Sequence, residues 1–139
     1  MKQAIALSAL LMTAAAAFAA GPKMNFIDHS NDRVMSSADA IAVMKEVIPA
    51  KVWKLYPASR WVFSSQVEGG LTTAGACVVT ARVMLLPLTP TLKAVLFRPS
   101  KTATAFDAIA KSDDAQCKAL AKDKLKEATE AVVSDLVKT

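Results

Sequence analysis

The first twenty residues are typical of an export signal rather than of a folded segment. Lys2 supplies a positive charge, residues 4–16 form a short apolar run, and Ala17-Phe18-Ala19 matches the small-x-small pattern of a cleavage site. The run is too short to cross a bilayer, which takes about 20 apolar residues. We therefore expect residues 1–19 to be a signal peptide. The mature chain would then be periplasmic or secreted and would have no transmembrane span.

The chain has two cysteines, Cys77 and Cys117, and export would place them in an oxidising compartment. An even number of cysteines in a small exported protein is typical of a disulfide. There is no C-x-x-C motif, so we favour a structural bridge over a redox pair. In the chain-entropy model, closing a loop of roughly 40 residues stabilises the fold by about 4 kcal/mol.

Length and charge limit the architecture and the partners. The chain of 139 residues, less the expected signal, has room for one domain. Its formal net charge of +5 favours an anionic envelope component or an acidic protein as the partner, although ordinary solubility charge would also explain it. Export counts against nucleic acid as a partner, because the chain leaves the compartment that holds it.

The front of the chain predicts an arm followed by a helix. Residues 20–35 are polar and aperiodic, which favours an extended N-terminal arm before a single α+β domain over residues 36–139. Ser36 has the chemistry of a helix cap, and apolar residues recur after it at spacings of three and four. We expect this helix to end at Pro49.

Two β-rich blocks, residues 60–68 and 71–86, predict a hairpin with Gly69-Gly70 as its two-residue turn. In that register Phe63 lies on the face opposite Cys77. A bulge near Gly75 would restore a common apolar face, and we favour it over a sheet that is covered on both faces.

The last third of the chain predicts two more strands and a long helix. Residues 91–97 favour a third strand, and residues 102–106 a fourth, with a helix as the rival interpretation. A helix starting at residues 112–114 carries an apolar stripe at steps of four and three. Its members are Cys117, Ala121, Leu125, Ala128, Val132 and Leu136. The expected fold is α+β: an N-terminal helix, an antiparallel β-meander of three to four strands and a C-terminal helix packed on the sheet, with one disulfide.

Little in the sequence points to catalysis. The only histidine, His29, lies in the polar run from Asp28 to Asp32. Zinc sites use three or four ligands, and residues adjacent in sequence cannot form a hydrolytic triad. There is also no phosphate-binding loop or nucleophile-elbow motif. We expect no enzyme, no catalytic residue, no metal site and no cofactor, and His29 as a general base is the rival hypothesis.

The segment from Lys51 to Trp61 holds both tryptophans, the only tyrosine and three positive charges. Amphipathic aromatic rings beside cations suit a surface that binds a protein or a membrane interface. Alternatively, the rings close the edge of the core while the cations extend into water. The predicted binding residues are Trp53, Lys54, Tyr56, Arg60 and Trp61.

These patterns favour an exported, non-enzymatic binding or accessory protein of the cell envelope. It would be a monomer or weak oligomer, and it would contact an unknown protein or an anionic envelope component through the basic-aromatic segment. The alternative is a small carrier of an apolar ligand, with a pocket between helices and sheet. That pocket would be lined by Met44, Phe63, Val83 or Leu125.

Overall fold

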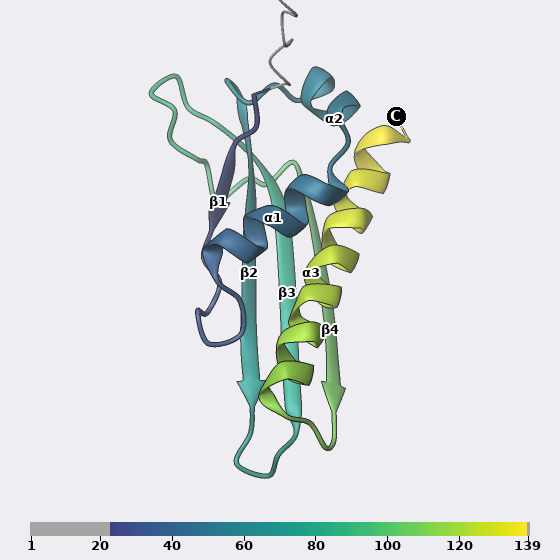
Figure 1. Ribbon diagram of the computed structural model, residues 1–139. Coiled ribbons are helices and arrows are strands. Elements are labelled where there is room, and N and C mark those ends of the chain that lie inside the picture. The colour runs from purple at the N-terminus through teal and green to yellow at the C-terminus, as the bar shows by residue number, and fades with distance from the viewer. Residues whose placement is uncertain (1–22, 139) are drawn as a thin grey trace, which may run out of the picture.

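A computed structural model describes residues 23–138, so the predicted export signal lies outside the described residues. The fold is α+β: one four-stranded sheet carries all of the described helices on the same face (Figure 1). The elements in chain order are β1 (Phe26–Asp28), α1 (Ser37–Val47), α2 (Ala50–Leu55), β2 (Trp61–Leu71), β3 (Cys77–Pro87), β4 (Lys101–Ile109) and α3 (Asp114–Val137).

The sheet is mixed, which corrects the prediction of a purely antiparallel meander. Its order is β1-β2-β3-β4, and β2, β3 and β4 pair antiparallel. β1 pairs parallel with β2, with Phe26 beside Phe63. Residues 26–28 belong to the predicted arm, so the ordered domain begins before residue 36. A strand of three residues is too short to show the period-two pattern that identifies strands in a sequence.

The N-terminal helix is confirmed as α1. Ser36 caps it by accepting a hydrogen bond from the Asp39 N–H at 3.1 Å. Pro49 ends this run of helix, and the short helix α2 begins directly after it. Because α2 has only six residues, it lacks the repeated apolar spacing that would have predicted it.

The turn between β2 and β3 lies further along the chain than predicted. Gly69 and Gly70 are inside β2, which continues to Leu71, and residues 72–76 make the turn. The Thr72 N–H donates to the Ala76 carbonyl at 2.7 Å, which closes this turn. Phe63 then pairs with Leu85 on the same face as Cys77. The two-residue turn and the bulge near Gly75 were therefore wrong, because the longer turn alone brings the apolar residues to one face.

Gly69 and Gly75 both have positive φ, at 116° and 76°, but for different reasons. A Cβ on Gly69 would lie 2.0 Å from the carbonyl oxygen of Val78, while a Cβ on Gly75 would meet nothing within 4 Å. Gly69 thus permits close approach of two backbones, and Gly75 only permits the turn.

We expect Gly69→Ala to lower the free energy of unfolding by about 3 kcal/mol or more, because a backbone atom cannot move aside cheaply. Gly75→Ala should lower the free energy of unfolding by only about 1–2 kcal/mol, which is the strain of placing a residue with a Cβ in the left-handed conformation. Urea denaturation of both variants measures the difference. Equal losses would contradict the register of β2 on β3.

The predicted strand at residues 91–97 is not formed. Residues 88–100 instead make an irregular connection with one isolated bridge, between Leu88 and Ala94. Within it, Thr89 closes a tight turn: its N–H donates to the Lys93 carbonyl, and its carbonyl accepts from the Leu92 N–H. These local hydrogen bonds use backbone N–H and C=O groups that would otherwise pair with a neighbouring strand. The strand that follows, β4, confirms the strand interpretation of residues 102–106.

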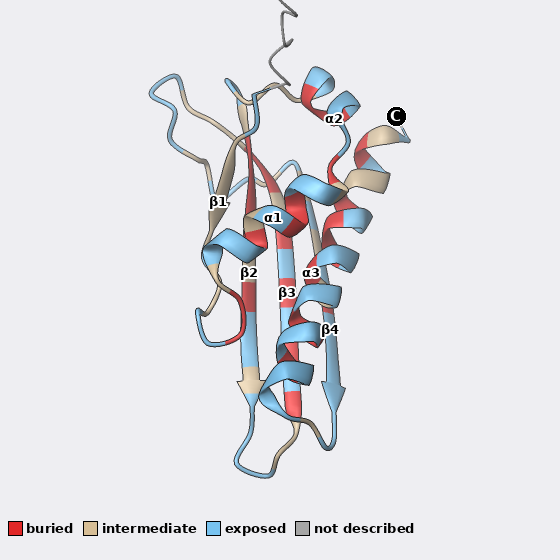
Figure 2. Cartoon of the chain, viewed as in Figure 1, coloured by how far each residue is buried: buried red, intermediate tan, exposed pale blue. Residues whose placement is uncertain are grey.

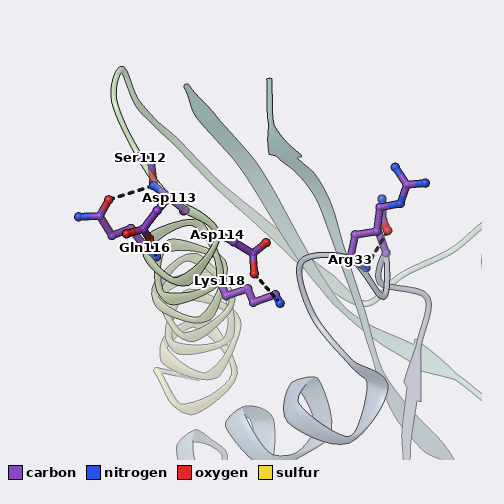
Figure 3. A network of polar contacts seen from close by, with 7 residues as sticks. Arg33, Ser112, Asp113, Asp114, Gln116 and Lys118 are labelled. Atoms are coloured by element: carbon purple, nitrogen blue, oxygen red, sulfur yellow. Dashed lines mark hydrogen bonds and ion pairs between the residues drawn. The ribbon is translucent and has the colours of Figure 1, made fainter. Parts of the chain in front are cut away.

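α3 covers the sheet as its pattern predicted, since every residue of the apolar stripe is buried (Figure 2). Asp113 and Gln116 form a reciprocal capping box at its start (Figure 3). Along the helix, Lys124 lies 2.6 Å from Glu127 and 3.7 Å from Asp107 of β4. Lys124 donates a hydrogen bond to the Glu127 carboxylate. This bond, helped by the negative charges of Glu127 and Asp107 and opposed by desolvation, raises the pKa of Lys124.

The predicted disulfide is confirmed. Cys77 starts β3 and Cys117 lies in the first turns of α3, with their Cα atoms 5.5 Å apart. The bond closes a separation of 40 residues that includes β3, the 88–100 connection and β4. It therefore ties the start of α3 to one end of β3, an inner strand of the sheet.

The double variant Cys77→Ala/Cys117→Ala should lose about 4 kcal/mol of unfolding free energy, because the unfolded chain regains the freedom of that loop. Urea denaturation of the variant and of the reduced wild-type protein should give similar losses. A loss well under about 1 kcal/mol in both would show that the bond adds little to the fold.

Candidate functional site

Trp53 lies in the core rather than on the predicted binding surface. It belongs to α2 and is 3 % exposed. Its ring packs edge-to-face on Phe26 at 5.5 Å and on Phe63 at 5.3 Å between ring centroids. Trp53 thus joins α2 to β1 and β2, and a partner could reach it only by opening the domain.

The other four predicted residues stay at the surface, where α2 leads into β2. Lys54 and Arg60 are exposed, and Tyr56 and Trp61 are half-buried. The Tyr56 and Trp61 rings pack edge-to-face at 5.5 Å. The structure therefore keeps these four residues near one another and removes Trp53 from the group.

The 88–100 connection lies beside Arg60 and Trp61. The Leu88 N–H donates to the Arg60 carbonyl at 2.8 Å. An open groove of about 290 Å³ runs between them, and its lining includes Arg60, Trp61, Pro87, Pro90 and Leu92. Figure 1 shows the connection and the α2–β2 junction at the same end of the sheet.

Three large apolar side chains of this connection face water. Leu92 is 67 % exposed, Leu96 is 54 % exposed and Phe97 is 95 % exposed. Single exposed apolar residues are common, but several in one short segment mark a surface that contacts a protein or a membrane. We call residues 88–100 the apolar loop. The sequence alone does not indicate this loop, because the same residues suit a strand.

The charges around the apolar loop are of one sign. Between Glu46 and Asp107 the sequence holds a single acidic residue, Glu68. Glu68 lies in the far half of β2, away from the junction. The basic residues of the apolar loop, the α2–β2 junction and the start of β4 are Lys51, Lys54, Arg60, Lys93, Arg98 and Lys101.

Two other hollows among the described residues have mixed charge. One, of about 420 Å³, lies between the start of α1 and α3, and its lining includes Asp32, Asp39, Lys118, Lys122, Val34 and Met35. The other lies on the open face of the sheet and is lined by Gln66, Glu68, Thr80, Arg82 and Thr104. Neither combines exposed apolar side chains with a uniform charge.

The polar run around His29 anchors β1 to β2. Asp28 accepts hydrogen bonds from the hydroxyls of Ser30 and Ser65, both at 2.6 Å. The Ser30 hydroxyl in turn accepts from the Val67 N–H at 2.9 Å. His29 itself is exposed. Over residues 23–138, no cluster of three or more histidine, cysteine or acidic side chains is placed to hold a metal ion.

Within the same range, none of the helices combines the length and the apolar character needed to span a bilayer.

Comparison with known proteins identifies no family. No protein-family model matches the sequence, and no curated protein matches it. Among solved structures, the chain is similar to the crystal structure of "a putative lipoprotein from Caulobacter crescentus CB15". The two are 9 % identical over 78 % of this chain and 83 % of that one, with a TM-score of 0.36. Similarity at this level carries no conclusion about function.

Replacing each tryptophan by alanine separates core from surface. Trp53→Ala should lower the free energy of unfolding by about 3–5 kcal/mol, because it leaves a cavity among three elements. Trp61→Ala should cost about half as much or less, since its ring is partly in water. Thermal and urea unfolding measure both losses. A surface role for Trp53 would be indicated by a loss no larger than that of Trp61→Ala.

Proposed function

We propose that this protein is an exported, non-enzymatic binding protein of the cell envelope that attaches to an anionic membrane surface through its apolar loop. The observation that carries the proposal is the exposure of Leu92, Leu96 and Phe97 in a segment whose charged residues are all basic. The partner is then an anionic phospholipid bilayer, which offers an apolar interior beneath a negative surface.

Apolar burial and electrostatic attraction contribute similar amounts to the free energy of membrane binding. Burying a Leu or Phe side chain is worth about 1.5–3 kcal/mol, and a cation near an anionic membrane adds about 1 kcal/mol. Immobilising the protein at the surface offsets part of both. Neither contribution alone attaches a peripheral protein stably to a membrane. The apolar loop has exposed apolar side chains and basic residues together, between Lys93 and Arg98.

The residues beside the loop suit the headgroup layer. Tryptophan and tyrosine are enriched at membrane interfaces because one end of the ring system is apolar and the other polar. Trp61 and Tyr56 are half-buried next to the groove, with exposed Arg60 beside them. Together with exposed Lys54, they would extend the contact from the loop to the α2–β2 junction, which keeps four of the five residues predicted from the sequence in the proposed surface.

The disulfide supports the expected location. A bond between Cys77 and Cys117 persists in oxidising compartments such as the periplasm and is rare in the cytosol. An envelope location also places the apolar loop where anionic bilayer surfaces are present.

The alternative of an apolar-ligand carrier finds less support. Met44, Phe63, Val83 and Leu125 are each fully buried in one packed cluster. The hollows described above open at the surface, and none is lined by any of these four residues.

Vesicle co-sedimentation tests the membrane proposal. The wild-type protein should bind vesicles that contain phosphatidylglycerol and should bind neutral phosphatidylcholine vesicles much more weakly. Leu96→Asp/Phe97→Asp should abolish binding, because it places two negative charges at the apolar tip. Lys93→Gln/Arg98→Gln should weaken binding by about 2 kcal/mol, or roughly 30-fold.

The matched control is Lys122→Gln/Lys126→Gln, which removes the same charge from the exposed side of α3. It should bind almost as the wild type does. Equal weakening by the two charge variants would show a response to net charge alone. Failure of the wild type to bind phosphatidylglycerol vesicles would overturn the proposal.

A further inference from the structure

β4 is an outer strand of the sheet and pairs on one side only, with β3. Eight of its nine residues are exposed or half-exposed, and Ala105 is the exception (Figure 2). The free edge of such a strand presents backbone N–H and C=O groups that another strand can pair with. Proteins blunt such edges with bulges, prolines, very short strands or charged side chains, and β4 has one contact of the last kind: the Asp107 carboxylate accepts a hydrogen bond from the Ala108 N–H at 2.7 Å. The pairing of β4 with β3 is unbroken from Lys101 to Ile109, and its sequence has no proline.

We infer that β4 pairs antiparallel with β4 of a second copy of this chain, about a two-fold axis at Thr104. In this register Lys101 lies opposite Asp107 of the second copy, and the symmetry makes the same pair twice. The register follows from charge, because opposite charges facing each other across two strands stabilise the pairing. Moving the two-fold axis by one residue along β4 places Lys101 opposite Ile109 or Ala105 and loses both pairs.

The proposed pairing of β4 also gives the exposed ring of Phe106 a neighbour. Phe106 is 76 % exposed on the open face of the sheet, opposite Thr80 of β3. In the two-fold register its other neighbour is Thr102 of the second copy. Aromatic and β-branched side chains facing each other across strands are a favourable combination. Pairing of β4 thus covers a ring that the single chain leaves in water.

α3 packs on both β3 and β4 and runs obliquely across β4 toward its C-terminal end (Figure 1). Pairing of two β4 edges would therefore bring the two copies of α3 next to each other.

The side of α3 next to the edge has compatible side chains. The 3.7 Å ion pair from Lys124 to Asp107 puts Lys124 on the β4 side of the helix. Glu127 and Ala131 follow at spacings of three and seven and so lie on the same side. Antiparallel copies of this strip bring acidic, basic and small side chains together rather than like charges alone.

A cysteine at the symmetry axis gives the first test. Residues facing each other across antiparallel strands have Cα atoms about 4.5–5.5 Å apart, within the range that a disulfide bridges. Thr104→Cys should therefore form a covalent dimer under mild oxidation, seen on a non-reducing gel. Thr102→Cys, on the same strand but opposite Phe106 of the second copy, is the matched control. Thr80→Cys, on β3 of the same face, is a second control.

Both controls should remain largely monomeric on that gel. Equal cross-linking of all three variants would indicate random collision and overturn the register. Absence of cross-linking at Thr104 would overturn the pairing itself. Thermal unfolding checks that each variant keeps the fold.

A charge exchange gives the second test, with sedimentation velocity as the measurement. Lys101→Asp and Asp107→Lys should each weaken the dimer by about tenfold or more, because each turns two attractive pairs into two repulsive ones. The double variant Lys101→Asp/Asp107→Lys should restore it. A double variant as weak as the single ones, or a wild type that is monomeric at every concentration reached, would refute the inference. Leu96→Asp/Phe97→Asp should leave the dimer intact, which separates this inference from membrane binding.

Discussion

The packing of the α3 stripe on the helix-facing side of β3 and β4 is the interaction on which the rest of the structure depends. Leu125 meets strand residues such as Val79 and Val83 in one buried cluster, and the Cys77–Cys117 bond fixes the helix at one end. α1 and α2 complete the same layer, and Trp53 joins α2 to β1 and β2. Because the apolar residues converge on one face, the other face, the β4 edge and the apolar loop are left for water or for partners.

The elements that could be predicted from the sequence are those whose signal is long or local. α3 repeats its apolar spacing over more than five turns, and the cap at Ser36 is a local hydrogen bond. The disulfide followed from export and an even cysteine count. In contrast, β1 is held by pairing with β2 and by the bonds to Asp28, which are interactions between distant residues. No window of sequence around residues 26–28 contains them.

The wrong predictions for Trp53, for Gly69-Gly70 and for residues 91–97 also arose because the contacts that decide them are not visible in the local sequence. Trp53 and Trp61 are similar in sequence, each beside a cation, but only Trp53 lies on the helix face that turns toward Phe63. Gly69-Gly70 has the letters of a hairpin turn, although a close approach to Val78 explains Gly69. In residues 91–97 an apolar run suits a strand and an exposed loop equally well. The side-chain hydroxyl and backbone groups of Thr89 decide between them by closing a turn first.

The apolar loop is tied down at both ends, and this has a thermodynamic consequence. The Val95 N–H donates to the Pro87 carbonyl at 2.9 Å, and the Ser100 N–H donates to the Leu85 carbonyl at 2.8 Å. Pro90 and Pro99 further restrict the backbone between these bonds. A loop that is ordered before it meets its partner loses little conformational entropy on binding. Its exposed apolar side chains and cations are therefore ordered before binding, and the entropy cost of that order belongs to folding rather than to association.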